Sequence, residues 1–390
     1  MRMLSLSFSG YRSFAARSPA AQARHLEHIR VAPLTILLGR NNGGKSTVAR
    51  LVHHTLAAVG ATGSDPFPMS SGAHSFGTSF RDIQHGGKFF NPLDLGIELE
   101  LEPGAQMHIA AQLMQAGELD DSHPHVVEFS VDSQRVHDGE HSGLLPAKAH
   151  FDKWRDGAAN LLASSCHVQP VRDPVKSNYD VGAVDPARAP VSNDDAAQLL
   201  LTDVELRTSV AQWMSENLDG WYADVKQSLD SFRLIARRAG RETNLSDSGQ
   251  GIQQVLPIIT LCCWRRLCRG PAPFIDIIEQ PELHLHDAAH AALGDLMLSA
   301  VADGRGNIIV ETHSEEVVLR VRRRVAEGLC PSNVALVYVE DMGDGSRLRE
   351  IALDETGEVD WWPEGVFSES LEEVKAIRRA QRAREEPDAF

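Results

Sequence analysis

The sequence has few cysteines and no long apolar run. Its 390 residues include five cysteines, none at the spacing of zinc ligands, and an odd, sparse set of this kind does not indicate a disulfide framework. We therefore expect reduced, buried thiols in a cytoplasmic protein. No stretch approaches the ~18 apolar residues of a membrane span, and the first residues lack the long apolar core of a secretory signal. These absences predict a protein with no membrane partner.

A surplus of positive charge is also missing. The chain carries 54 acidic and 38 basic side chains, for a formal net charge of −16. A chain with this balance is not a general polyanion binder, so any contact with DNA would need a local basic patch. The candidate patch is the cluster of Arg320, Arg322, Arg323 and Arg324. We favour a solvated face at the carboxyl end of a helix, and a DNA-facing patch is the alternative.

The remaining composition is that of a globular protein with more than one structural unit. Hydrophobic residues make up 42% and charged residues 24%. Because single cores stop growing at about 250–300 residues, we expect one large domain with an inserted lobe, or two domains. Alternating apolar residues over 97–102 and 127–131 predict an antiparallel sheet. Continuous apolar runs at 274–278 and 307–310 are typical of buried parallel strands.

A glycine-rich loop lies between a predicted strand and a predicted helix. Its sequence, GRNNGGKS at 39–46, fits the pattern GxxxxGKS/T. Backbone N–H groups of such a loop bind phosphates, and the lysine reaches the β- and γ-phosphates while the serine ligates Mg²⁺. The alternative is an ordinary glycine-rich turn. We predict a site for ATP and Mg²⁺ formed by Gly39, Asn41, Asn42, Gly43, Gly44, Lys45, Ser46 and Thr47.

Polar residues follow both predicted parallel strands. Glu279 ends the first run, where a carboxylate at the carboxyl edge of the sheet can hold Mg²⁺ through water. His313, within ETHS after the second run, can donate to a γ-phosphate or a bound water. A third motif, DSGQG at 247–251, begins a predicted helix with two glycines that can expose N–H groups to a phosphate. Taken singly, each has a plain structural alternative: a strand end, a structural histidine and a tight turn.

In this order the motifs resemble the ABC-type ATPase heads of the SMC, RecF and OLD kind. The opening strand and GYRSF at 10–14 also resemble that group. Three longer runs, DSGQGIQQVLP, EQPELHLH and ETHSEEVVLRVRRR, resemble a narrower family of compact bacterial predicted ATPases, many of them linked to phage defence. The resemblance implies an α/β P-loop ATPase head with an antiparallel β-subdomain and an inserted helical lobe.

We divide the chain into four parts on this basis. Residues 1–145 form the N-terminal half of the head with the P-loop, 146–230 the helical lobe, 231–368 the C-terminal half, and 369–390 a C-terminal helix and tail.

The resemblance also implies a head-to-head homodimer with two ATP molecules at the interface. Lys45, Ser46, Glu279 and His313 of one copy would meet Ser248 and Gly249 of the other. Gln84, after the first helix, is the candidate glutamine that links Mg²⁺ to the lobe, and a solvated loop glutamine is the alternative.

Two positions depart from the wider superfamily. The usual acidic pair before the proline is here Glu279-Gln280, and glutamine cannot accept a proton. Glu282 is the substitute base that we consider first. Asp247 replaces the usual serine of the signature turn, so Ser246 or Ser248 would contact the γ-phosphate. The four residues Glu282, His284, His286 and His290 could suggest a metal site, but we favour a dimer interface there.

The predicted function is Mg²⁺-dependent ATP hydrolysis in the ATPase and sensor subunit of a bacterial anti-phage defence complex. We expect the effector, a nuclease or toxin, in another protein, because Glu340, Asp341 and Asp344 lie on a predicted hairpin turn and not in a nuclease domain. Two alternatives remain. One is a RecF-like DNA-repair ATPase, which would need a basic surface. The other is a nucleotide-gated scaffold with very slow hydrolysis, which Gln280 would favour.

Overall fold

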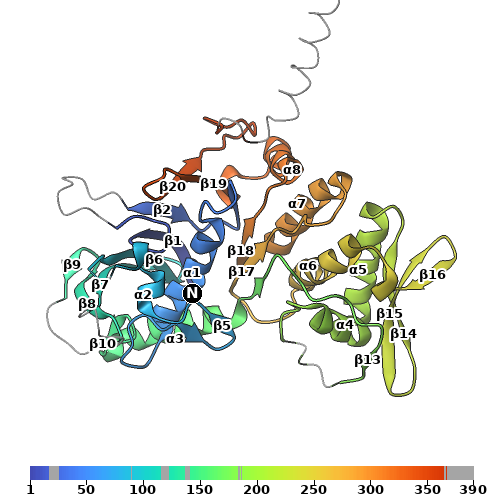
Figure 1. Ribbon diagram of the computed structural model, residues 1–390, viewed down its shortest axis with the longest axis horizontal. Helices are drawn as coiled ribbons and strands as arrows, with labels where there is room; N and C mark the ends of the chain where they lie inside the picture. Colours follow the sequence, from blue (N-terminus) through green and yellow to red (C-terminus); the bar gives the residue numbers. More distant parts are fainter. Residues whose placement is uncertain are drawn as a thin grey trace, which may run out of the picture.

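The computed structural model describes residues 1–16, 26–88, 90–115, 123–136, 141–182, 185, 187–363 and 366. Within them, an antiparallel sheet with α1 to α3 lies on one side of the molecule, and a lobe built on α4 and α5 lies on the other (Figure 1). Parallel strands run between the two. The predicted C-terminal helix and tail at 369–390 lie outside the described residues.

A six-stranded, mostly parallel sheet forms the centre. Its order is β12 (His167–Val168), β17 (Phe274–Glu279), β18 (Gly306–Glu311), β3 (Leu34–Gly39), β19 (Val334–Asp341) and β20 (Ser346–Ile351). Only the β19–β20 pair is antiparallel. The two parallel strands predicted from continuous apolar runs are thereby confirmed as β17 and β18.

The four inner strands of this sheet are largely apolar because both of its faces are covered. In β3, Leu34, Ile36 and Leu38 pack into one core, whereas Leu37 packs into a second core on the opposite face. The helices of the first core are α4 (Asn193–Thr202), α5 (Val204–Asn217), α6 (Gln250–Arg266), α7 (Asp287–Val301) and α8 (Glu315–Ala326). The second core contains α1 (Lys45–Gly60) and α3 (Asp152–Ser164).

The predicted antiparallel sheet covers that second core. Its order is β2 (Glu27–Arg30), β1 (Arg2–Ser9), β6 (Leu93–Glu102), β7 (Ala105–Met114), β8 (His125–Val131) and β9 (Gln134–Arg135). Ile97 of β6 lies between Leu6 and Ile109 in the register and is fully buried, while the adjacent Glu98 is exposed. The alternation that predicted these strands is therefore the alternation of their two faces. The smaller elements on this side are β4 (Ser70–Ser71), β5 (His74–Ser75), α2 (Phe80–Ile83), β10 (His141–Ser142) and β11 (Leu145–Pro146).

The lobe has different bounds from the predicted range of 146–230. Helix α3 packs on α1, with Leu161 and Leu162 buried in the second core, and β12 joins the central sheet beside β17. Both belong to the head. The lobe instead includes β13 (Tyr179–Asp180), β14 (Tyr222–Gln227), β15 (Ser231–Arg238) and β16 (Arg241–Asn244), packed on α4 and α5.

A buried ion pair joins helix α6 to the central sheet. Arg265 donates from Nε and Nη2 to the two carboxylate oxygens of Asp276 in β17, both at 2.8 Å, and their side chains are 1% and 0% exposed. The backbone N–H of Cys166, just before β12, donates to the same carboxylate at 3.0 Å. Three elements distant in sequence are therefore held by one carboxylate.

The thiols are reduced, but the prediction that all are buried was wrong. Cys166, Cys262 and Cys263 are buried, whereas Cys268 and Cys330 are exposed. Cys268 follows α6 and Cys330 follows α8, and both lie in loops at the surface. No helix in the described ranges is long and apolar enough to cross a bilayer.

Two adjacent histidines are buried on the inner side of α1. His53 Nε2 donates to the carbonyl oxygen of Ile275 at 2.7 Å, and His54 Nε2 donates to that of Pro68 at 2.9 Å. Burial lowers the pKa of each imidazole to about 3. Both side chains are therefore neutral in the folded chain at pH 7.

These histidines predict a loss of stability in mild acid. Their folded pKa lies below the value of 6.5 of an unperturbed histidine, so between the two values only the unfolded chain binds the protons. Their contribution is complete above about pH 6.5 and is lost as the pH falls, by at most about 1.4 kcal/mol per pH unit for each. His53→Gln should reduce the slope of the unfolding free energy, measured by denaturant titration between about pH 6 and pH 4.5, by about 1 kcal/mol per unit.

Val52→Ala is the matched control, because Val52 is a buried, non-titrating neighbour on the same helix. It should lower the unfolding free energy without changing its slope. An equal pH slope in wild type and His53→Gln would contradict the assignment.

Candidate functional site

At two positions the glycine-rich loop has a backbone conformation that only glycine can adopt. Gly39 and Gly44 have φ values of 144° and 104°. A Cβ at Gly39 would lie 2.3 Å from the carbonyl oxygen of Val339, and one at Gly44 would lie 2.7 Å from Ser13 Oγ. Gly44 is also the N-cap of α1, so the free N–H groups at the start of that helix face the loop.

The loop opens onto a cleft of about 660 Å³, which we call the P-loop cleft. Its lining brings together the loop, the segment after β1 and the ends of β17 and β18. The lining residues are Arg12, Ser13, Asn41, Asn42, Gly44, Lys45, Ser46, Thr47, Gln280 and Glu311.

Lys45 is the buried cation of this cleft. Its side chain Nζ donates to the carbonyl oxygens of Gly39 at 3.0 Å and Arg40 at 2.9 Å, and the residue is 3% exposed. Glu311 Oε1 lies 3.7 Å from Nζ. Burial lowers the pKa of Lys45, and the carboxylate of Glu311 opposes that shift.

Glu311 is a site residue that the sequence analysis missed. Its Oε2 accepts a hydrogen bond of 2.5 Å from Ser46 Oγ, so one carboxylate contacts both the lysine and the serine of the loop. Glu311 ends β18, which lies between β17 and β3, and it stands opposite Leu37 in the register. Which carboxylate lies nearest the loop therefore depends on the order of the strands in the sheet. No local pattern in the sequence predicts that order.

Glu279 lies one strand further from the loop and does not line the P-loop cleft. Its Oε1 accepts hydrogen bonds from Arg50 Nη2 at 3.0 Å and from His167 Nε2 at 2.7 Å. Burial would raise the pKa of Glu279, but the bonds from His167 and Arg50 outweigh it and hold that pKa below its usual value. In this structure Glu279 is thus an ionised carboxylate engaged by two basic side chains.

Gln280, Glu282 and His313 lie together beside the cleft. Gln280 has a left-handed backbone, with φ of 47°, and its N–H donates to the carbonyl oxygen of Glu311 at 2.8 Å. Glu282 is 8% exposed, and its Oε1 accepts the backbone N–H of His313 at 2.6 Å. Its Oε2 has no hydrogen-bond partner among the described residues.

Burial shifts the pKa values of Glu282 and His313. Burial raises the pKa of the Glu282 carboxyl, and the hydrogen bond from the His313 N–H opposes only part of that shift. Partial desolvation and the nearby charge of Lys45 lower the pKa of His313. His313 is therefore a neutral imidazole close to the lysine, with an exposed side chain.

The two remaining predicted site regions do not line the P-loop cleft of their own chain. Gly249 is the exposed N-cap of α6, and a Cβ there would meet nothing within 4 Å. Ser248 Oγ donates to the carbonyl oxygen of Leu245 at 2.6 Å. Gln84 is 2% exposed, forms a bridge with Tyr11 and donates from Nε2 to the carbonyl oxygen of Asn91 at 2.8 Å.

Arg172 connects the two halves of the candidate site. Its Nη2 donates to the carbonyl oxygens of Glu279 at 2.8 Å and Gln280 at 3.3 Å, and its Nη1 donates to that of Gln254 in α6 at 3.1 Å. The residue is 5% exposed. The end of β17 and the helix that carries the signature turn are therefore joined through one side chain.

The arginine cluster of α8 forms ion pairs within the chain. Arg320 and Arg324 both contact Asp295, Arg323 contacts Glu327 and Arg322 contacts Glu358. This agrees with a structural face and leaves less charge for DNA. No cluster of three or more histidine, cysteine or acidic side chains in the described part of the chain could hold a metal ion.

Ser46 and Glu311 fit the magnesium that the loop implies. A hydroxyl and a carboxylate oxygen in direct contact are the hard oxygen donors that Mg²⁺ prefers, and both lie beside the phosphate-binding N–H groups. The donor chemistry of the cleft therefore suits a nucleotide with its magnesium.

Comparisons with known proteins agree with this geometry. Residues 189–318 match a family model described as AAA ATPase domain, AAA_15, a range that contains the signature turn, β17 and β18. An SMC head bound to the C-terminal winged-helix domain of ScpA is 12% identical, with a TM-score of 0.54 over 90% of this chain and 99% of that one. No curated protein matches the chain.

An SMC head with an extended coiled coil, bound to the C-terminal domain of ScpA and derived from Pyrococcus furiosus, is 10% identical. Its TM-score is 0.52 over 96% of this chain and 99% of that one. This chain has the fold of an ABC-type ATPase head. The likeness at this identity concerns the fold alone, and it confirms the predicted fold class.

The buried contact between Lys45 and Glu311 predicts a stability effect. Glu311→Gln would leave Lys45 buried without its carboxylate, and removing one partner of a buried pair costs about 3–5 kcal/mol. We expect a loss of about 3 kcal/mol in unfolding free energy by denaturant titration, near the lower bound because the two backbone carbonyls remain. Glu340→Gln, at the exposed end of β19 in the same sheet, is the control and should change little. Equal losses in the two variants would show that Glu311 does not stabilise Lys45.

Proposed function

We propose that this chain binds Mg²⁺-ATP in the P-loop cleft and hydrolyses it to ADP and phosphate. The observation that carries the proposal is the buried Lys45 at the start of α1, in contact with Glu311, which also binds Ser46. An ammonium group, a helix N-terminus and free backbone N–H groups together attract an anion with several oxygens. The AAA ATPase match and the likeness to SMC heads support this reading.

Each residue has a part in binding. The N–H groups of the loop and the Lys45 ammonium hold the β- and γ-phosphates, and the Ser46 hydroxyl and the Glu311 carboxylate hold Mg²⁺. When bound, Mg²⁺ neutralises charge on the phosphates. Glu279 is the second carboxylate proposed for this ion, and it would first have to leave Arg50 and His167.

The base that activates water is the unusual part of the proposal. Gln280 lines the cleft but cannot accept a proton, so it can only orient water. Glu282 is adjacent, and burial raises the pKa of its carboxyl, which is the direction that makes an ionised carboxylate a stronger base. His313, neutral and near Lys45, can donate to the γ-phosphate. We propose slow turnover until a partner completes the site.

The position of the signature turn favours a second copy of the chain as one partner. Ser248 and Gly249 immediately precede α6, Gly249 is exposed, and neither lines the P-loop cleft of its own chain. We propose that they cap the ATP held by the other copy of a homodimer. Arg172 would then carry a change at the end of β17 to that helix.

The most specific part of the proposal is the biological role. The resemblance to compact ATPases linked to phage defence supports an ATPase and sensor subunit with its effector in another protein. The two SMC heads were both solved with a piece of ScpA, so this fold accepts a separate protein on its surface. Ion pairing of the α8 arginines weakens the DNA-repair alternative.

ATP binding can be measured without hydrolysis. A ligand present at about 100 times its dissociation constant adds about 2.7 kcal/mol to the stability of the folded state. ATP with Mg²⁺ should therefore raise the melting temperature of wild type by several degrees, and Lys45→Ala should abolish the shift. Lys153→Ala, on the exposed face of α3, is the matched control and should keep it. Equal shifts in wild type and Lys45→Ala would place ATP elsewhere.

Dimer formation through the signature turn is tested by light scattering. ATP should convert wild type from monomer to dimer, and Gly249→Asp should prevent this because a carboxylate would face the γ-phosphate. Leu229→Asp adds the same charge at a position that is 97% exposed, on the β14–β15 hairpin, and should still dimerise. If Gly249→Asp dimerises with ATP as readily as wild type, the turn does not form the interface.

A further inference from the structure

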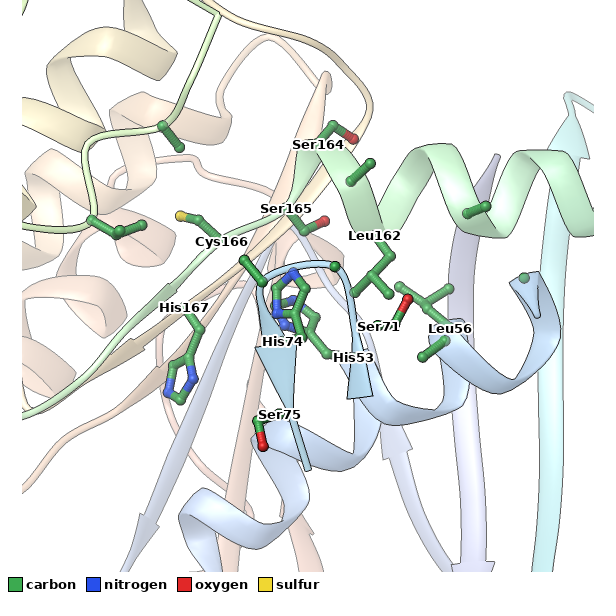
Figure 2. Close-up of a pocket in the computed structure, with 18 of the residues that line it drawn as sticks. His53, Leu56, Ser71, His74, Ser75, Leu162, Ser164, Ser165, Cys166 and His167 are labelled. Carbon is green, nitrogen blue, oxygen red and sulfur yellow. The ribbon is translucent and has the colours of Figure 1, made fainter. Parts of the chain in front are cut away.

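A second cavity lies on the other side of Glu279 from the P-loop cleft. It has a volume of about 560 Å³ and shares no lining residue with that cleft. Helix α1, the β4–β5 hairpin, the end of α3, the start of β12 and the segment 187–191 enclose it (Figure 2). The volume is within the range of about 300–1,000 Å³ that small-molecule sites occupy.

The side chains of this cavity that are always charged are both arginines. Arg50 and Arg188 line it, and none of its described lining residues is an aspartate or glutamate. That is unusual in a chain with 54 acidic and only 38 basic side chains. Both arginines are ion-paired, Arg50 with Glu279 and Arg188 with Asp195, so what the cavity offers an anion is the guanidinium N–H groups that these pairs leave unused.

Arg50 supplies the donor for such an anion. Its Nε and Nη2 bind Glu279, while its Nη1 has no hydrogen-bond partner among the described residues. The side chain is 37% exposed, and Glu279 holds its guanidinium in place. Arg188 is less committed, since it is 70% exposed and lies 3.5 Å from Asp195.

The rest of the cavity suits an uncharged body. His53 and His74 lie edge to face in its floor, with ring centroids 4.8 Å apart, and burial lowers the pKa of both so that they act as neutral rings. Figure 2 shows His167 on one side of these rings and Leu56 and Leu162 on the other. The cavity therefore has a basic side, next to Arg50 and His167, and an apolar side.

We propose that this cavity binds a small organic anion of about nucleotide size. Its phosphate or carboxylate would bind Arg50, and its uncharged body would pack on His53, His74 and Leu162. The site is distinct from the P-loop cleft and goes beyond the proposed hydrolysis of ATP.

Calorimetric titration in a Lys45→Ala background tests this site without interference from the P-loop. AMP is the phosphate probe, indole-3-acetate is the carboxylate probe and adenosine is the uncharged control. At least one anionic probe should bind with a dissociation constant below about 1 mM, and adenosine should bind at least about tenfold more weakly. Failure of both anions to bind would overturn the proposal.

Matched substitutions locate the binding. Ala163→Trp, from an exposed position at the end of α3, should fill the cavity and weaken binding at least about tenfold. Asn160→Trp adds the same ring to the same helix outside the cavity and should leave binding unchanged. Ser75→Trp, on the β4–β5 hairpin, gives a second filling variant should Ala163→Trp not fold. Unchanged affinity in both filling variants would overturn the site.

Discussion

The buried contact between Lys45 and Glu311 is the constraint on which the rest of the site depends. An ammonium group that is 3% exposed, at the N-terminus of a helix, needs compensation by negative charge or by carbonyl oxygens. Two loop carbonyls and one carboxylate supply it, and that carboxylate also binds Ser46. Since one carboxylate faces both an ammonium group and a helix end, it offsets only part of their positive charge, and the proposed binding of phosphates depends on the remainder.

Buried hydrogen bonds also connect the site to helix α6. Asp276 holds Arg265 of α6 within the central sheet, and Arg172 joins the end of β17 to Gln254 of α6. The signature turn at Gly249 begins that helix. The end of β17 is therefore hydrogen-bonded to the helix that begins at the exposed turn. The second cavity is adjacent to the same strand end, because Arg50 and His167 line it and both bind Glu279.

Much of this molecule could be predicted from its sequence, because the signals are local. The glycine-rich loop, the apolar runs of β17 and β18 and the alternation of β6 each follow from neighbouring residues. The role of Glu311 could not be predicted, because it depends on β18 lying between β17 and β3. Nor could the ion pairs of Arg320 and Arg324, since their partner Asp295 lies 25 and 29 residues away. Helix α3 falls inside the predicted lobe range of 146–230, because its packing on α1 is a contact between residues about 100 positions apart that no local pattern predicts.

Single-turnover hydrolysis of ATP by the purified chain with Mg²⁺ tests the central claim most directly. We expect phosphate release by wild type and none by Lys45→Ala. Because a positioned base contributes about 10²–10⁴-fold, Glu282→Gln should slow release at least about tenfold while ATP still binds. Phosphate release that survives both substitutions, or no release by wild type at any protein concentration, would contradict it.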